Sequence, residues 1–156
     1  IADLLARYNY ILGNMPYLTK QFKFCAAHKY WNPSWDKDKN YDVFGEDVRI
    51  HGHNYVLDVT ITGPINEESG FIFDIMELKN IINQNVISKL DHSQIQEDID
   101  WFAGKQPSTE NLVCFIWESI VEHIKKPVVL YKIKLRETPT IFTEYYGPKG
   151  IINEKQ

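Results

Sequence analysis

The sequence predicts an α+β domain in which an antiparallel sheet of four strands carries two helices on one face. Residues of alternating polarity form four segments, two in the first half of the chain and two near its end. Two segments between them have apolar residues at helical spacing, and turn-forming residues separate the segments. The expected order is therefore ββααββ. The length of 156 residues suits one domain over 1–156, with residues 1–17 as an extension before the first strand.

The first strand is expected to end at His28. Phe22, Phe24 and Ala26 alternate with polar or small residues, so they share one face of the strand with His28. The segment 30–47 that follows is dense in Asn, Asp, Lys, Pro and Trp without a clear period, and it reads as a long loop. Loops of this length inside a compact domain are usually functional.

The second strand is predicted from His51 to Thr62, with His51 and His53 on one face, and it closes at a Gly-Pro turn. A short strand over 71–73 is expected next. It leads into a helix that begins at Asp74 and carries apolar residues at helical intervals to Leu90.

A second helix is expected to begin in the segment 107–110, where Pro, Ser, Thr and Glu are typical of a helix N-terminus. Two strands complete the sheet. Residues 129–137 alternate, with Glu137 on an otherwise apolar face, and a Thr-Pro-Thr turn leads to a last strand over 141–146.

The most specific chemical feature is the pair His51 and His53, because residues two apart on a strand project side by side. His28 supplies a third imidazole from a neighbouring strand. Three imidazoles without a fourth protein ligand are typical of a catalytic Zn2+ site, which keeps one position open for water or substrate. A lone histidine on an apolar face is more often a satisfied core residue. Three on inward faces favour the metal site, although imidazole also suits copper, iron and nickel.

Carboxylates lie near these histidines in the sequence. Glu46 and Asp47 end the long loop just before His51, where one of them could act as a general base or acid over the metal. An ordinary acidic turn is an equally good interpretation. Glu137, on its apolar face, needs a partner, and a ligand with paired N–H donors would serve.

Two further pairs are candidates of weaker specificity. Asp91 and His92 could form a proton relay in which the carboxylate orients the imidazole, or they could simply end the first helix. Thr109 and Glu110, at a helix N-terminus, could bind a ring or an anion, and they suit plain capping equally well.

Composition favours a globular protein, with a cytoplasmic location as the default expectation. The net charge of −4 is spread along the chain without a basic patch, so nucleic acid and acidic membranes are poor partners. No apolar stretch approaches the roughly 20 residues that span a bilayer. Cys25 and Cys114 lie in apolar runs, and a disulfide framework is not expected.

Five short motifs, in this order, resemble the 6-pyruvoyltetrahydropterin synthase family. The resemblance implies a T-fold, in which trimers close their sheets into a barrel and two trimers stack into a homohexamer with active sites between subunits. It makes His28, His51 and His53 the zinc ligands and Glu137 the anchor for the guanidine-like edge of a pterin. Asp91 and His92 would be the proton relay, with Thr109 and Glu110 lining the pterin pocket. The motifs are Phe24–His28, His51–Tyr55, Leu90–His92, Ser108–Asn111 and Arg136–Thr138.

The chain departs from the family pattern at one position. Members that make 6-pyruvoyltetrahydropterin carry a catalytic cysteine shortly before the histidine pair, and the segment 44–50 has none. Cys25 precedes His28 on the other strand face and does not replace it. The chain is similar to the variant subgroup in which glutamate replaces the cysteine, and Glu46, or else Asp47, takes that role. That subgroup cleaves 7,8-dihydroneopterin triphosphate to 6-hydroxymethyl-7,8-dihydropterin. The alternatives are synthesis of pyruvoyl or carboxy tetrahydropterin, and an inactive pterin-binding module.

Overall fold

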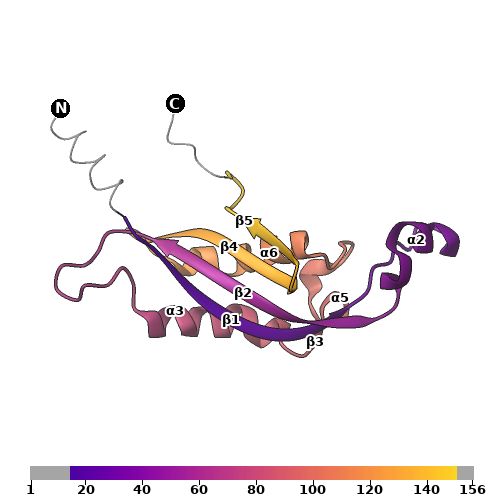
Figure 1. Cartoon of the computed structure of the whole chain (residues 1–156), viewed down its shortest axis with the longest axis horizontal. Coiled ribbons are helices and arrows are strands. Elements are labelled where there is room, and N and C mark those ends of the chain that lie inside the picture. Colours follow the sequence, from indigo (N-terminus) through magenta and orange to yellow (C-terminus); the bar gives the residue numbers. More distant parts are fainter. Residues whose placement is uncertain (1–14, 151–156) are drawn as a thin grey trace.

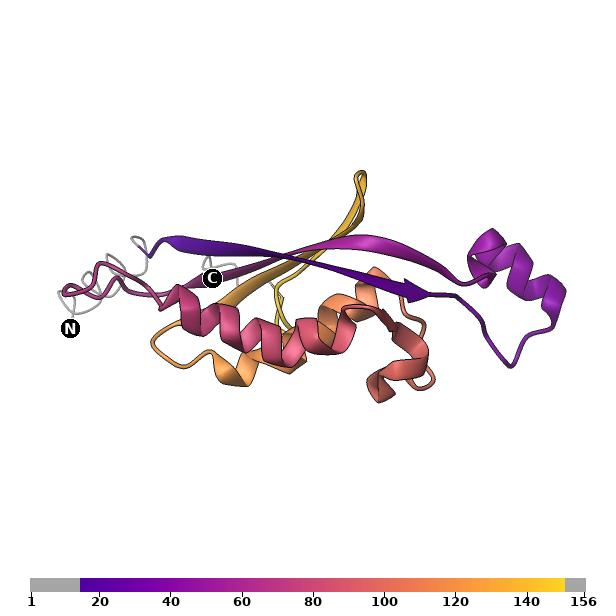
Figure 2. The same ribbon diagram turned by 90° about the horizontal axis from the view of Figure 1, so that it is seen from below.

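A twisted five-stranded sheet with helices on one face forms the body of the molecule (Figures 1 and 2). The computed structural model describes residues 15–150. The strand order is β3-β1-β2-β4-β5, and all pairs are antiparallel except β1 with the short β3. The predicted α+β class is thus confirmed. The strands are β1 (Tyr17–His28), β2 (His51–Thr62), β3 (Ser93–Gln94), β4 (Val129–Thr138) and β5 (Ile141–Tyr145).

The helices follow the order of the sequence, and two helical stretches pack on the sheet as predicted. The first comprises α3, a π-helical turn η2 and α4, and the second is α6 (Figure 2). The helical segments are α2 (Lys37–Phe44), η1 (Gly45–Val48), α3 (Ile75–Ile82), η2 (Asn83–Ile87), α4 (Ser88–Leu90), α5 (Ile95–Asp98), η3 (Asp100–Phe102), α6 (Thr109–Ile120) and η4 (Val121–His123).

Within residues 15–150, one apolar core lies between the sheet and these helices. It contains the residues of β1 and β2 that alternate inward, such as Phe24, Tyr55 and Leu57, together with Leu78 of α3 and Ile116 of α6. Burial of such side chains contributes roughly 1.5–3 kcal/mol each. Because the histidines of β1 and β2 occupy the next positions on the same face, they lie at the end of this core rather than on the open face of the sheet.

Both long helices begin at the predicted capping residues. The Asp74 carboxylate accepts a hydrogen bond from the backbone N–H of Met76, and the Ser108 hydroxyl accepts one from Asn111. Each cap satisfies a backbone donor that has no partner within its helix. The start of α6 matters for function, because it fixes where Pro107 and Thr109 lie.

The structure corrects three details of the predicted elements. The sheet has a fifth strand, β3, which is two residues long and pairs with Ala26 and Ala27. Residues 71–73 are not a strand: the Phe71 carbonyl accepts from Asn66, so this backbone is used in a local turn. The predicted loop 30–47 contains α2 and much of η1, because Asp36 caps the helix and the buried Asn40 amide donates to the carbonyls of Asn32 and Asp36.

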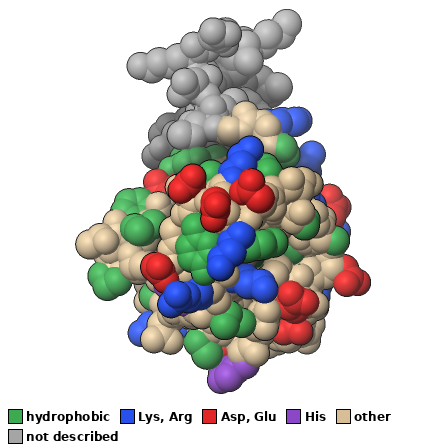
Figure 3. All heavy atoms as spheres, turned by 90° about the vertical axis from the view of Figure 1, so that its right-hand side faces the viewer, with side chains coloured by type: hydrophobic (Ala, Val, Ile, Leu, Met, Phe, Trp, Pro, Cys, Tyr) green, Lys and Arg blue, Asp and Glu red, His purple; other side chains and the backbone are tan. Residues whose placement is uncertain are grey.

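Residues 1–14, which include most of the predicted extension over 1–17, lie outside the described residues, and β1 begins at Tyr17. Within residues 15–150 no helix is long and apolar enough to cross a membrane. At the end of the molecule that carries α2, acidic and basic side chains are interspersed (Figure 3).

Gly147, just after β5, is expected to be the most sensitive glycine of the fold. It has φ = 87°, and a Cβ built there would lie 2.5 Å from the buried Trp117 ring. We expect Gly147→Ala to lower the free energy of unfolding by about 2–4 kcal/mol, from backbone strain and overpacking together. Urea unfolding measures this loss.

Gly104→Ala is the matched control for Gly147→Ala. Gly104 has φ = 74° and no heavy atom within 4 Å of a built Cβ, so it isolates the backbone contribution. An equal loss in the two variants would show that contact with Trp117 has no effect.

Candidate metal centre

Three histidines meet at one end of the β1–β2 pair because of the strand register. His28 is directly opposite His51, and Ala26 is opposite His53. Residues opposite each other in an antiparallel pair point to the same side of the sheet. One ring nitrogen from each histidine lies within 4.8 Å of the others. The sequence prediction that these three imidazoles converge therefore agrees with the register.

Backbone carbonyls orient two of the rings. His28 Nδ1 lies 2.7 Å from the Pro107 carbonyl oxygen, and His51 Nδ1 lies 2.8 Å from that of Arg49. A carbonyl can only accept, so Nδ1 carries the proton in both rings and the neutral imidazole presents its lone pair at Nε2. Histidines that bind metals are usually held in this way.

The nitrogen spacing fits a tetrahedral ion. His28 Nε2 and His53 Nε2 are 3.1 Å apart. Zinc–nitrogen bonds of about 2.0–2.1 Å place two ligands of a tetrahedral centre about 3.3 Å apart. The spacing of His28 and His53 therefore suits two ligands of one divalent ion, and a nitrogen of His51 lies within 4.8 Å of both.

Burial keeps the imidazoles of His28 and His53 in the form that binds a metal. Burial lowers the pKa of His28 from 6.5 to about 4, against the opposing effect of the Pro107 carbonyl. It also lowers the pKa of His53, with a further contribution from His51. A neutral ring at neutral pH does not have to lose a proton before it binds a metal.

Glu137 of β4 reaches the same point. Its Oε1 lies 3.4 Å from His28 Nε2 and 3.2 Å from His53 Nε2. Burial raises the pKa of this carboxyl, and the negative charges of Asp47 and Glu110 act in the same direction. The predicted acidic side chain is thus beside the histidines and largely withdrawn from water.

The two acidic residues that precede β2 point in different directions. Glu46 is highly exposed and pairs with Arg49 at 3.2 Å. Asp47 Oδ1 lies 3.8 Å from His51 Nε2, and its charge acts on His28, His53 and Glu137. Of the two carboxylates weighed in the sequence, Asp47 is the one that faces the histidines.

The N-terminus of α6 closes another side of the site. Thr109 is buried, accepts a hydrogen bond from Thr143 of β5 and donates to Glu110. The charge of Glu110 acts on both Glu137 and Tyr30, whose ring packs 5.1 Å from that of His28. The helix therefore brings the predicted pair 109–110 to the same region as the histidines.

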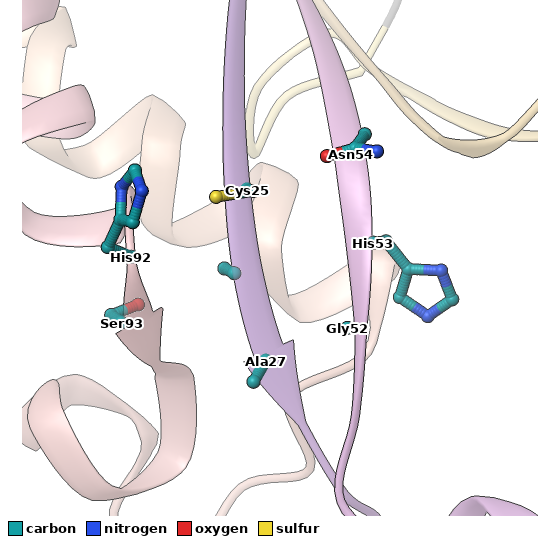
Figure 4. Close-up of a pocket in the computed structure, with 8 residues that line it drawn as sticks. Cys25, Ala27, Gly52, His53, Asn54, His92 and Ser93 are labelled. Carbon is teal, nitrogen blue, oxygen red and sulfur yellow. The ribbon is translucent and has the colours of Figure 1, made fainter.

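Asp91 and His92 are paired, but they are not beside the metal ligands of their own chain. Asp91 Oδ2 lies 3.0 Å from His92 Nδ1, and its Oδ1 accepts from the backbone N–H of Cys25. That backbone hydrogen bond is the main cause that lowers the pKa of Asp91. His53 and His92 lie on opposite sides of the β1–β2 pair (Figure 4).

Three features of the site were not predicted from the sequence. Tyr30 shows only one signal, an aromatic residue two positions after a metal ligand. The carbonyl of Pro107 leaves no mark in side-chain patterns. The sequence of Cys25 and its neighbours gives no sign of metal binding, yet Cys25 forms a cluster of possible metal ligands with Asp91 and His92.

Comparison with known proteins agrees with these features. The family model described as 6-pyruvoyl tetrahydropterin synthase matches residues 17–148. A 6-pyruvoyl tetrahydrobiopterin synthase of Drosophila melanogaster is 37% identical over 142 residues, which cover 88% of this chain and 84% of the relative. A 6-carboxy-5,6,7,8-tetrahydropterin synthase of Bacillus subtilis is 29% identical over 111 residues, covering 67% of this chain and 73% of the relative.

The fold is also similar to that of a solved structure from this family. The 6-pyruvoyl tetrahydropterin synthase of Caenorhabditis elegans superposes with a TM-score of 0.80 at 28% identity, and covers 85% of this chain and 96% of the other. Family model, relatives and solved structure agree, and they confirm the resemblance found in the sequence motifs. The chain belongs to the 6-pyruvoyl tetrahydropterin synthase family, a family of lyases.

Proposed function

We propose that this protein is a zinc-dependent pterin lyase that acts on 7,8-dihydroneopterin triphosphate and releases 6-hydroxymethyl-7,8-dihydropterin. The observation that carries the metal dependence is the pair of carbonyl hydrogen bonds that turn the Nε2 lone pairs of His28 and His51 into the site. When bound, zinc supplies a Lewis acid that lowers the pKa of a substrate hydroxyl.

The choice of product rests on the kind of base near the histidines. No cysteine thiol occurs in the segment 44–50 before His51, whereas the Asp47 carboxylate lies 3.8 Å from that ring. A carboxylate suits removal of a proton from a hydroxyl. Collapse of the resulting alkoxide at the second side-chain carbon breaks the bond between the first two side-chain carbons. The electron pair goes to the pterin ring system and the first carbon is reprotonated, so that glycolaldehyde triphosphate leaves.

The proton relay of Asp91 and His92 is proposed to serve the metal centre of a second copy of the chain. The pair faces away from its own histidines, and His92 is exposed. β1 pairs with β3 only at Ala26 and Ala27 within the described residues, and β5 forms the other edge with exposed Ile141. Pairing of these edges in a trimer, and stacking of two trimers into a hexamer, would bring relay and metal together.

Glu137 is proposed to bind the guanidine-like edge of the pterin, with Thr109 and Glu110 beside it. We expect Glu137→Gln to raise KM by about 10- to 100-fold, because a hydrogen bond to a charged group contributes about 1.5–3 kcal/mol. Steady-state kinetics measures the change. Glu144→Gln, on β5 and paired with Lys132, is the control. An unchanged KM with an unchanged metal content would exclude this role.

The experiment that tests the function identifies the products. Purified protein with measured zinc content is incubated with 7,8-dihydroneopterin triphosphate, and the products are separated by chromatography. The expected result is 6-hydroxymethyl-7,8-dihydropterin without free inorganic triphosphate, since the phosphates stay on the two-carbon fragment. Release of triphosphate would overturn the proposed product.

A second candidate is synthesis of 6-pyruvoyltetrahydropterin, which the name of the Drosophila relative favours. The Bacillus relative suggests the carboxy product in the same way. Both of these activities keep the fold and the metal site. Because their products differ from that of the first candidate, the same chromatogram separates them. Pterin binding without any turnover by zinc-loaded protein would favour an inactive binding module instead.

A further inference from the structure

A second cluster of possible metal ligands lies on the other face of β1. It consists of the Cys25 thiol, the Asp91 carboxylate and the His92 imidazole, each with one donor atom within 4.8 Å of the others. Cys25 alternates with His28 along β1, so the two clusters point to opposite sides of the sheet. The cluster is therefore separate from the metal centre of the same chain.

The backbone holds the three residues together. The Cys25 N–H donates to Asp91 Oδ1 at 3.0 Å, and the His92 N–H donates to the Cys25 carbonyl at 2.6 Å. His92 has φ = 62°, which is uncommon for a residue other than glycine. These contacts fix the backbone positions from which the side chains project. The side-chain torsion angles of the exposed His92 remain free to adjust.

A hollow of about 330 Å³ opens beside the cluster and gives it access to solvent. Cys25, His92 and Ser93 line one part of it, and Gly52 and Asn54 line another. The Cys25 sulfur points toward the side on which His92 lies (Figure 4). A small ion can therefore reach the sulfur without a change in the sheet.

The three donors match a thiophilic divalent cation. Thiolate, imidazole and carboxylate are all ligands of zinc, and a thiolate selects zinc or cadmium over magnesium and calcium. Asp91 keeps Oδ1 on the Cys25 amide, and its Oδ2, which lies 3.0 Å from His92 Nδ1, would exchange that contact for the ion. Zinc binds such donors at about 2.0–2.3 Å in a tetrahedral arrangement, so three protein ligands leave a fourth position for water.

We propose that Cys25, Asp91 and His92 form a second and weaker site for a thiophilic divalent cation, and that an ion bound there inhibits the enzyme. The inhibition rests on the proposed function, because it needs Asp91 and His92 as the proton relay. A metal ion on the imidazole occupies the lone pair that would accept the proton. The binding itself does not depend on that role.

Cadmium alone is the probe for binding. Equilibrium dialysis of the metal-free protein is expected to give two cadmium ions per chain, with an ultraviolet charge-transfer band of a cadmium–thiolate bond for the second. Cys25→Ser is expected to bind one ion and to lose the band. Cys114→Ser, which removes the other free cysteine, is expected to behave as the unchanged protein.

A measurement on the unchanged chain guards against a folding defect in the variant. Bound cadmium is expected to slow alkylation of Cys25 by iodoacetamide at least about tenfold, as read by peptide mass, and to leave Cys114 unaffected. One ion per chain, a second ion that persists in Cys25→Ser, or equal protection of both cysteines would each overturn the site.

Inhibition is tested separately with zinc. Zinc added beyond one ion per chain is expected to abolish turnover. For the same inhibition, Cys25→Ser is expected to need a zinc concentration at least about tenfold higher. Loss of even an outer partner of a metal ligand costs roughly 10- to 100-fold in affinity. Equal sensitivity of the two proteins would overturn the inhibition. If the unchanged protein has no lyase activity at all, the proposed function fails while the cadmium result stands.

Discussion

His53→Ala is expected to reduce turnover by roughly 10³-fold or more and to remove the bound metal. His53 supplies one of the three imidazoles, with its Nε2 3.1 Å from that of His28. A metal ion contributes several kcal/mol to stabilisation of a transition state, and each 1.36 kcal/mol is a factor of ten in rate. Activity assays together with metal analysis of the same preparation measure both effects.

The control for this loss is His123→Ala. His123 lies in η4, is exposed, and is outside both ligand clusters. It is expected to keep its metal and its activity. Treatment of the unchanged protein with a chelator is expected to reproduce the His53→Ala defect, and added zinc should reverse the chelator effect but not that of the substitution.

Metal binding is also expected to change stability, which gives a readout that does not depend on catalysis. An ion that binds only the folded state stabilises the protein by about 2.7 kcal/mol when its free concentration is about 100 times its Kd. Thermal unfolding of the unchanged protein should therefore shift upward when zinc is added, and His53→Ala should shift much less. Equal shifts in the two proteins would place the ion elsewhere.

Much of the fold could be predicted because the strands and helices carry local signals. The alternation of Phe22, Phe24 and Ala26 predicts an inward face of β1, and that face is buried. Asp74 and Ser108 cap helices where the sequence indicated. In these segments the pattern of burial and the local hydrogen bonds favour the same structure.

The elements that were missed depend on contacts that no short segment reveals. α2 carries mainly polar residues and lacks an apolar stripe, and its anchor is the buried Asn40 amide. β3 exists only because Ser93 and Gln94 come to lie beside the far end of β1. Neither the buried amide nor the pairing has a periodic signature.

The positions of the site residues on strands could be predicted from the sequence. The positions of those on loops could not. The spacing of His51 and His53 on one strand, together with the register that sets His28 opposite His51, accounts for the imidazoles. Whether Glu46 or Asp47 faces them depends on the turn of η1, which side-chain identity does not reveal. The face of the sheet on which Asp91 lies depends likewise on β3.

Asp47→Asn is expected to lower kcat by about 10²- to 10⁴-fold with little change in metal content, which is the range for loss of a general base. The Asp47 carboxylate is 3.8 Å from His51 Nε2, which places it beside the proposed metal centre. Asparagine has nearly the same shape and cannot accept a proton. Single-turnover measurements separate this step from product release.

Glu46→Gln is the matched control and tests the other carboxylate of the pair. Glu46 is exposed and paired with Arg49 rather than with a histidine, so its replacement is expected to change kcat less than about threefold. A large loss in Glu46→Gln with activity retained in Asp47→Asn would reverse the assignment and require η1 to turn on substrate binding. Equal losses would indicate that both carboxylates share the proton, because neither alone would then be sufficient.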